Sequence, residues 1–332
     1  MPKNTDIAIR FLETQWSGIN DNKVKGIIAE TEFRNYLIKN QIHHIPGGWI
    51  LTPGKNTNAV IPSLHKICLI PIEASFSWNN CKDSNTLTPA QMSAYNFFRQ
   101  VGVTTYFVYA NKIDESQFQL PTKSNGKLKA TYPRPYKLLF KSMDHNGQFV
   151  DTNFETMMQK FPIRNGNMGM RSYEQGRINR STPPWSNPSI ISELFWFEYT
   201  RYYCQVDYLV SNNDLDLFIV GQSGSAYPVE LKSKSPVVDS SLGDWFGLDV
   251  GPFAKMTFFT ANSMNTDALY VVQEVDEFRN HIEWLALKFT DLVKNCSWVI
   301  QSGGKGMMGG ASSTIKIPKA AFTPLDKLLP RL

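Results

Sequence analysis

Residues 214–232, with the sequence DLDLFIVGQSGSAYPVELK, decide the fold that we expect for this chain. The apolar runs on either side of GQSGS have the composition of β-strands, and GQSGS itself is typical of a hairpin turn. A hairpin about this turn brings Asp216 and Glu230 to the same end of the two strands. Because side chains alternate along a strand, Glu230 and Lys232 project from the same face. The segment therefore predicts that two acids and one lysine converge.

Two carboxylates beside a lysine are suited to the hydrolysis of phosphodiester bonds. Mg²⁺ prefers oxygen ligands, keeps several bound waters and takes one or two carboxylates from the protein. In such a site the metal polarises the phosphate and holds the attacking water, while a lysine orients that water or neutralises developing charge. The alternative is a surface hairpin with an ordinary Glu–Lys pair. The residues around Glu230 are apolar on both faces of the strand, which favours a central strand and the catalytic interpretation.

The order of these residues resembles the PD-(D/E)xK nuclease superfamily, which includes most type II restriction endonucleases and also repair and junction-resolving nucleases. The resemblance covers about residues 188–275, where the expected order of helix, three strands, helix and strand is similar to the superfamily core. It implies that Asp216 and Glu230 are Mg²⁺ ligands and that the Leu231 carbonyl is a further ligand. It also implies that Lys232 positions the attacking water.

Two further acids enter through the same resemblance. Glu198, on the helix expected before the hairpin, matches a place where many members of the superfamily have an extra acid. Leu215 stands where the superfamily's name-giving proline precedes the aspartate. This departure leaves Asp214 as a competitor of Asp216, although the uninterrupted apolar run after Asp216 favours Asp216 as the ligand.

The expected fold class is α/β, with a restriction-endonuclease-like core (a mixed central sheet flanked by helices) and an additional N-terminal α/β domain. The sequence suggests an N-terminal domain over residues 1–141, a polar Arg/Gly-rich connector over 142–187 and a catalytic domain over 188–332. Apolar periodicity, turn residues and helix starts predict the elements. Helices are expected at 27–39, 89–100, 189–203, 252–262 and 277–294, and strands at 49–51, 67–72, 104–110, 206–210, 216–220, 226–232, 268–275 and 314–317.

The first half contains a fainter version of the same pattern. In the segment IPIEAS, which ends in Glu73-Ala74-Ser75, Glu73 takes the place of Glu230, but Ser75 stands where a lysine is expected. No aspartate lies between Trp49 and Glu73, so this half lacks a metal ligand and the lysine. It is either a degenerate copy of the nuclease core used for DNA binding or an unrelated α/β domain.

Basic residues gather in the middle of the chain. Residues 116–143 contain six lysines and arginines and no acid. Arg164, Arg171, Arg177 and Arg180 follow among glycines, asparagines and serines, with Glu174 as the only acid. These arginines are candidates for contacts with phosphates or guanine edges. The alternative is a solvated linker between the two halves.

The composition restricts the class of protein. With 42% hydrophobic and 19% charged residues, the 332-residue chain is expected to bury a core, and its formal net charge of +5 is too small to prove a nucleic-acid partner. The four cysteines form no CxxC pair, which favours free thiols in a reducing compartment over a zinc ribbon or a disulfide framework. We find no signal peptide and no membrane span in the sequence, and therefore expect a cytoplasmic protein.

The sequence thus predicts a Mg²⁺-dependent endonuclease of double-stranded DNA, most like a sequence-specific type II restriction endonuclease. The alternatives are a repair, resolvase or transposase-associated nuclease on the same core, and a non-catalytic DNA-binding protein. Cutting both strands of a palindrome favours a homodimer. A restriction enzyme also implies a cognate DNA methyltransferase encoded by a neighbouring gene.

Overall fold

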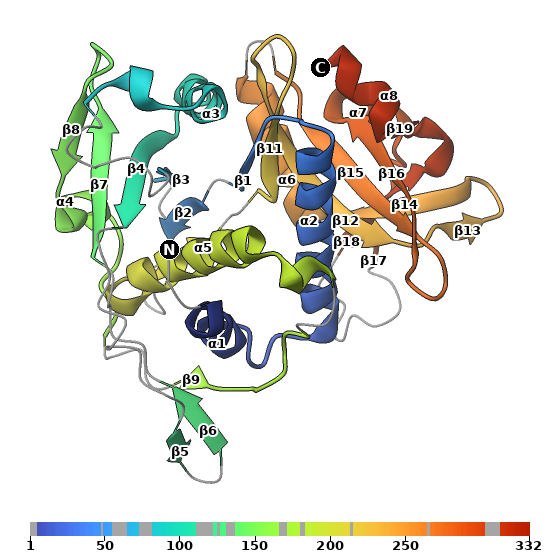
Figure 1. Cartoon of the computed structure of the whole chain (residues 1–332). Coiled ribbons are helices and arrows are strands. Elements are labelled where there is room, and N and C mark those ends of the chain that lie inside the picture. Colours follow the sequence, from blue (N-terminus) through green and yellow to red (C-terminus); the bar gives the residue numbers. More distant parts are fainter. Residues whose placement is uncertain are drawn as a thin grey trace. The chain divides into compact units, whose positions relative to one another are not determined.

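The computed structural model shows helices and strands throughout the chain (Figure 1). It describes residues 5–47, 49–54, 65–72, 82–110, 122–124, 127–130, 137–165, 171–179, 183–212, 215–263, 266–302 and 313–332. The chain folds into two compact units that are interleaved along the sequence. Unit 1 contains Met1–Val24, Gly48–Thr88 and Val103–Asp214, and unit 2 contains Lys25–Gly47, Pro89–Gly102 and Leu215–Leu332.

Unit 2 is built on a six-stranded mixed sheet. Its strands, in spatial order, are β1 (His44–Pro46), β11 (Leu217–Val220), β12 (Ala226–Lys234), β15 (Leu269–Val275), β16 (His281–Lys288) and β19 (Thr323–Pro324). β12 and β15 are parallel and every other neighbouring pair is antiparallel. A parallel pair needs a crossover connection. Here the crossover contains α6 (Val250–Asn262), whose Met256 and Phe259 are buried.

Helices cover both faces of this sheet. On one face, α2 (Asp21–Lys39) buries Ala29, Phe33 and Leu37 against side chains of β11, β12, β15 and β16, with α8 (Leu325–Leu328) beside it. On the other face, α6 and α7 (Phe289–Asn295) pack with α3 (Pro89–Gln100), whose Phe98 ring lies 5.1 Å from that of Phe218. A four-stranded sheet lies next to α6 and α7. Its strands, in order, are β13 (Val237–Asp239), β14 (Gly243–Asp249), β18 (Ser313–Pro318) and β17 (Gln301–Ser302).

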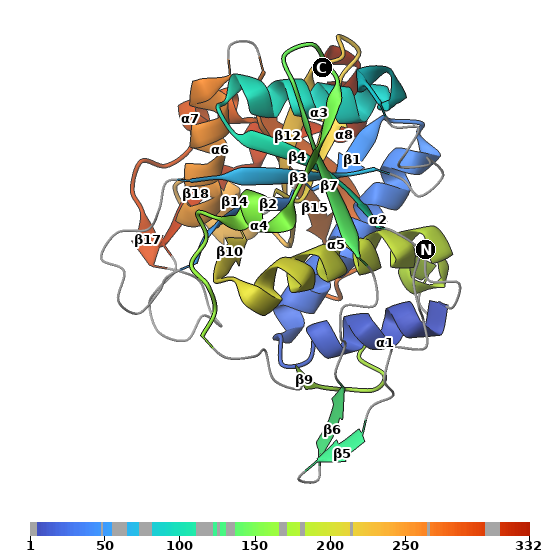
Figure 2. The ribbon, with the colours of Figure 1, turned by 90° about the vertical axis from the view of Figure 1, so that its left-hand side faces the viewer.

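Unit 1 contains a second six-stranded mixed sheet. Its order is β10 (Val210–Asn212), β2 (Trp49–Pro53), β3 (Ile67–Pro71), β4 (Thr104–Ala110), β7 (Leu138–Met143) and β8 (Phe149–Thr152). Only β3 and β4 are parallel among these neighbours. α5 (Pro188–Asp207) lies beside α1 (Thr5–Gln15) in both views (Figures 1 and 2), and the Phe11 ring of α1 lies 5.2 Å from that of Phe195. Unit 1 also contains α4 (Phe154–Met158) and a small sheet of β5 (Thr122–Ser124), β6 (Lys127–Ala130) and β9 (Arg171–Ser172).

The expected α/β class with mixed sheets flanked by helices is confirmed, but the division of the chain differs from the sequential one over residues 1–141, 142–187 and 188–332. Residues 25–47 and 89–102 group with the C-terminal part because β1 completes the edge of its sheet and α3 packs on that sheet. The start of the expected connector contains β8 and α4, which belong to unit 1.

Two element predictions were wrong. Of the strand expected at residues 206–210, the first two residues are the end of α5, which continues to Asp207 because buried Tyr203 and Cys204 extend its apolar face, and only Val210 belongs to a strand, β10. The helix expected at residues 277–294 is β16 followed by the short α7. The run from Trp284 to Leu287 is buried along a central strand, and a short apolar run of this kind does not distinguish a strand from a helix by periodicity alone. Residues 243–249, for which no element was expected, form β14.

Among the residues that the structure describes, no helix has both the length and the apolar character needed to cross a membrane.

The packing of α2 on the sheet of unit 2 predicts a large effect of Phe33→Ala. The Phe33 side chain is fully buried, with its ring 4.8 Å from that of Trp284, so its truncation should lower the free energy of unfolding by roughly 3–5 kcal/mol. Ile38→Ala on the same helix is the control, because Ile38 is 54% exposed and its loss should cost about 0.5 kcal/mol or less. Urea denaturation measures both variants, and equal effects would contradict this packing.

Candidate active site

The hairpin of β11 and β12 places the predicted acids side by side. Leu217 pairs with Val229, so Asp216 and Glu230 follow one step beyond the last pair of the ladder. The Asp216 backbone N–H donates to the Val229 carbonyl at 3.2 Å. Asp216, Glu230 and Lys232 share one face, because the alternate residues Leu217, Val229 and Leu231 are buried on the opposite face, which α2 covers. The three predicted catalytic residues therefore converge.

Glu230 lies at the centre of this cluster. Its side chain is only 3% exposed, and its Oε1 accepts a hydrogen bond from Lys232 Nζ at 2.6 Å. Its Oε2 lies 3.3 Å from Nζ of Lys255. Burial of a carboxylate is costly unless it is paired and hydrogen-bonded, and two ammonium groups provide both. The lysine side chains are about one quarter exposed, at 27% and 26%, so the cluster is open on the lysine side.

Lys255 was not found by the sequence analysis. It lies on α6, 25 residues after Glu230, and forms no motif with Glu230-Leu231-Lys232. It reaches the carboxylate because α6 connects the parallel strands β12 and β15 and packs on the face that carries Glu230. The only signal in the sequence is a lysine within an otherwise apolar helix, PFAKMTFF.

Asp216 has an environment in which its charge is unfavourable. Burial raises the pKa of the Asp216 carboxyl well above its ordinary value, and the negative charges of Glu230 and of Glu30 on α2 raise it further. Lys232 and the Leu231 N–H, which donates to Asp216 Oδ2, oppose this rise without cancelling it. A bound cation would remove the conflict between the neighbouring carboxylates. The site is therefore suited to a positive ion.

The Leu231 carbonyl faces the same edge as the Asp216 carboxylate. In a strand, the N–H and C=O of one residue point to the same side, and the Leu231 N–H points toward Asp216 beyond the end of the β11 ladder. The geometry is therefore compatible with the role implied for the Leu231 carbonyl as a further ligand.

The surroundings keep Lys232 protonated. Burial by itself would lower the pKa of the Lys232 ammonium, but the charges of Glu230 and Asp216 outweigh this effect and raise the pKa above its ordinary value. Next to it, the Tyr270 hydroxyl donates to the Gly247 carbonyl at 2.8 Å, and Lys234 Nζ donates to the same oxygen at 2.6 Å. These bonds connect β12 and β15 to β14 behind the cluster. Lys232 is thus a fixed cation and not a neutral base.

The donors match Mg²⁺ in kind. No group of three or more His, Cys, Asp or Glu suited to a metal occurs among the residues that the structure describes. Asp216 and Glu230 supply two carboxylates, which is the number that Mg²⁺ takes when phosphate and water complete its coordination. Both oxygens of Glu230 contact lysines, so an ion bound there would take the place of one ammonium. The two carboxylates therefore fit Mg²⁺ in the chemistry and the number of their oxygen donors.

The remaining predicted residues lie elsewhere. Glu198 is on α5 in unit 1, where its carboxylate accepts from Trp16 Nε1 and pairs with Arg201, each at 3.2 Å. It is not among the groups that unit 2 brings together. The helix that covers the sheet behind Asp216 is α2 and not α5, and α2 carries Glu30, the acid that raises the pKa of Asp216. Asp214 lies outside the described residues.

The predicted DNA-binding arginines have partners in unit 1 where the structure describes their side chains. Arg164 Nε donates to the Gln205 carbonyl at 2.8 Å. Arg177 lies 3.3 Å from Asp21 and 3.6 Å from Glu174, and it donates to the Ile19 carbonyl. These contacts give both arginines a structural role, and their contact with DNA stays a prediction. Only the backbone of Arg171, in β9, is described, and Arg180 lies outside the described residues.

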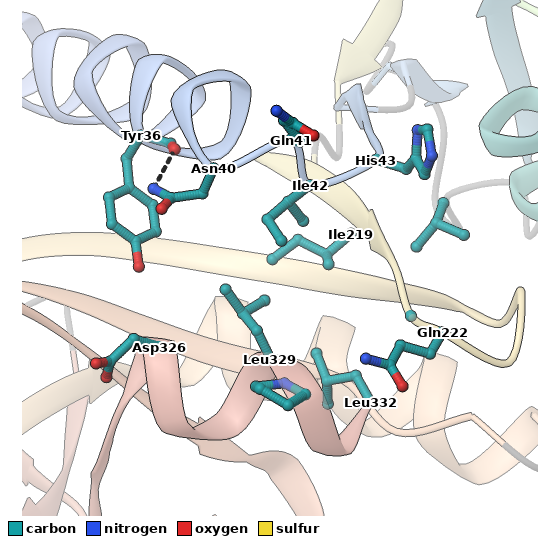
Figure 3. Close-up of a pocket in the computed structure, with 13 residues that line it drawn as sticks. Tyr36, Asn40, Gln41, Ile42, His43, Ile219, Gln222, Asp326, Leu329 and Leu332 are labelled. Atoms are coloured by element: carbon teal, nitrogen blue, oxygen red, sulfur yellow. Dashed lines mark hydrogen bonds between the residues drawn. The ribbon is translucent and has the colours of Figure 1, made fainter.

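A pocket of about 490 Å³ lies at the other end of the hairpin from Asp216 and Glu230. Figure 3 shows Ile42, Ile219, Leu329 and Leu332 around it, with the polar side chains of Tyr36, Asn40 and Asp326 toward one side. Asn40 Nδ2 donates to the Tyr36 carbonyl at 2.8 Å. Because this pocket adjoins the turn end of β11, it is not part of the carboxylate–lysine cluster.

Comparisons with models of protein families, with curated proteins and with solved structures gave no match to this chain. The assignment of a function therefore depends on the geometry of the cluster.

The raised pKa of Asp216 predicts a pH-dependent effect of Asp216→Asn on stability. Above roughly pH 4 the unfolded chain ionises this carboxyl, whereas the folded protein resists ionisation, so the wild type loses stability as pH rises until the folded group also ionises. Asparagine removes this loss. In EDTA, thermal unfolding should show a stability gain for the variant that is small near pH 4 and largest at neutral pH. A gain that does not change with pH would contradict the prediction.

Proposed function

We propose that this protein is a Mg²⁺-dependent endonuclease that hydrolyses phosphodiester bonds of double-stranded DNA. The observation that carries the proposal is the convergence of Asp216, Glu230 and Lys232 on one face of β11 and β12, with Lys255 on the same carboxylate. In a structural ion pair, one lysine would suffice for one buried glutamate. Here a second carboxylate and a second lysine meet at the open end of a hairpin, where a phosphate and its metal ion can enter.

The sheet topology supports a restriction-endonuclease-like core in unit 2. An antiparallel pair, β11 and β12, is followed by a helical crossover to the parallel strand β15. This order matches the last four elements of the order that the resemblance to the PD-(D/E)xK superfamily implies, whereas the first helix and strand of that order, α5 and β10, belong to unit 1. Asp216 directly precedes β11, and Glu230 and Lys232 lie along β12, which supports their proposed roles.

In the proposed reaction Asp216, Glu230 and the Leu231 carbonyl would hold Mg²⁺, which would supply polarisation of the phosphate. Lys232 orients the attacking water, since its ammonium is fixed against Glu230 at 2.6 Å. The water oxygen forms a bond to phosphorus, its proton passes to solvent, and the bond from phosphorus to the leaving oxygen breaks. The ion would take the place of Lys255 on Glu230 Oε2, and the ammonium of Lys255 would then give a proton to the leaving oxygen and neutralise its charge.

We further propose that cleavage is sequence-specific, as in a type II restriction endonuclease. The basic residues of the middle of the chain, which include Lys123 and Lys137, are suited to phosphate contacts. The partner is then double-stranded DNA, and a cognate methyltransferase would protect the host's own sites.

Loss of any one of the three predicted residues should abolish cleavage. Asp216→Asn, Glu230→Gln and Lys232→Met each remove a metal ligand or the group that orients the water, so each should reduce the rate of plasmid cleavage in Mg²⁺ by roughly 10²-fold or more. Lys294→Met is the control, because Lys294 is 71% exposed on α7 and should leave the rate unchanged. Near-wild-type cleavage by any of the three variants would remove that residue from the proposed mechanism.

The role of Lys255 can be separated from that of Lys232 by the leaving group. Lys255→Met should slow cleavage of ordinary DNA by roughly 10²-fold, because the leaving oxygen then departs without a proton. A substrate with sulfur in place of that bridging oxygen leaves as a stable thiolate and should restore the rate.

The same sulfur substrate should not rescue Lys232→Met, since Lys232 acts on the water. If both variants are rescued alike, or if neither is, the assignment of Lys255 to the leaving group is wrong.

A further inference from the structure

The two large sheets repeat one arrangement of strands. In unit 2 the order is β11, β12, β15, β16, and in unit 1 it is β2, β3, β4, β7. In each sheet the first pair is antiparallel, the second is parallel and the third is antiparallel. Each parallel pair is connected along the chain through a helix, α6 in one case and α3 in the other. These elements therefore follow one another in the same sequence order twice, with β13 and β14 inserted before α6 in one half and β5 and β6 inserted before β7 in the other.

The elements before each repeat also correspond. A long helix and a short strand precede both, α2 and β1 in the first half and α5 and β10 in the second. β1 pairs antiparallel with β11, and β10 pairs antiparallel with β2. The short strand that precedes β2 in the sequence, β1, therefore pairs in the sheet of β11. The short strand that precedes β11, β10, pairs in the sheet of β2. Two α/β folds of independent origin have no reason to share this reciprocal exchange, whereas two copies of one fold explain it.

The strand registers align the repeats residue by residue. The first residue of β11, Leu217, pairs with Val229, and the first residue of β2, Trp49, pairs with Leu69. One step further along, the position of Glu230 corresponds to Ile70, which is 1% exposed.

Two residues later, the position of Lys232 corresponds to Ile72, which is 7% exposed. By sequence, the residue before Trp49 at the position of Asp216 is Gly48. The match of Glu73 and Ser75 to Glu230 and Lys232 was therefore three residues out of register, and both residues lie outside the described part of the chain. The first repeat has buried isoleucines where the second has its catalytic groups.

We propose that the chain is a fused pair of two copies of one nuclease fold, of which only the second is catalytic, so that a single chain cuts one strand of the duplex per binding event. This inference rests on the proposed function. Enzymes that cut two strands at once need two sites, which a symmetric homodimer supplies. A chain that already contains both copies needs no partner chain. Because only one copy carries the catalytic residues, it can make only one cut per binding event. The inference replaces the homodimer expected from the sequence.

The test is cleavage of a supercoiled plasmid in Mg²⁺ over a range of enzyme concentrations. We expect the nicked circle to accumulate before the linear form and the initial nicking rate to be proportional to enzyme concentration. We also expect Glu230→Gln to remove nicking and linearisation together, while Ile70→Leu retains both.

Three results would overturn the inference. A linear first product whose rate rises with the square of the enzyme concentration indicates a dimer of active sites. Nicking without linearisation by Glu230→Gln indicates a second active site in the chain, which still cuts one strand. Either result leaves the proposed nuclease function standing. Absence of cleavage by the folded wild type would overturn the nuclease function and this inference with it.

Discussion

The buried carboxylate of Glu230 is the constraint on which the rest of the site depends. A carboxylate buried within a central strand requires positive partners, and the chain supplies one from its own strand and one from α6. Asp216 then stands beside Glu230 with its pKa raised by burial and by its like-charged neighbour. A divalent cation can take the place of one ammonium on Glu230, because both lysine side chains are about one quarter exposed and the displaced ammonium can turn to solvent.

The fold places this cluster through the order of its strands. The hairpin brings the acids together, and the crossover through α6 adds Lys255 on the same face. The opposite face is covered by α2, a helix from the first half of the chain, and the sheet edge is completed by β1. Unit 2 is therefore not an independent C-terminal segment. Its stability depends on elements that precede β2 in the sequence.

The hairpin and its three site residues could be predicted because they are local. Alternation places Glu230 and Lys232 on one face, and the GQSGS turn fixes which residue of the first strand lies opposite. Lys255 could not be predicted, since its distance from Glu230 depends on how α6 packs. Glu198 was predicted because the helix before the hairpin was expected to cover the sheet of the hairpin. That helix, α5, belongs to unit 1, and α2 from the first half of the chain covers the sheet of the hairpin instead. Such an exchange leaves no trace in local periodicity.

The most direct measurement of the central claim is incubation of the wild-type protein with plasmid DNA in Mg²⁺, in Ca²⁺ and in EDTA, with DNA binding followed in parallel. The two carboxylates beside Lys232 predict cleavage in Mg²⁺. They also predict binding without cleavage in Ca²⁺, whose longer and looser coordination positions the water poorly. In EDTA the DNA should remain intact. Full cleavage in EDTA, or no cleavage in Mg²⁺ by folded protein, would contradict the account.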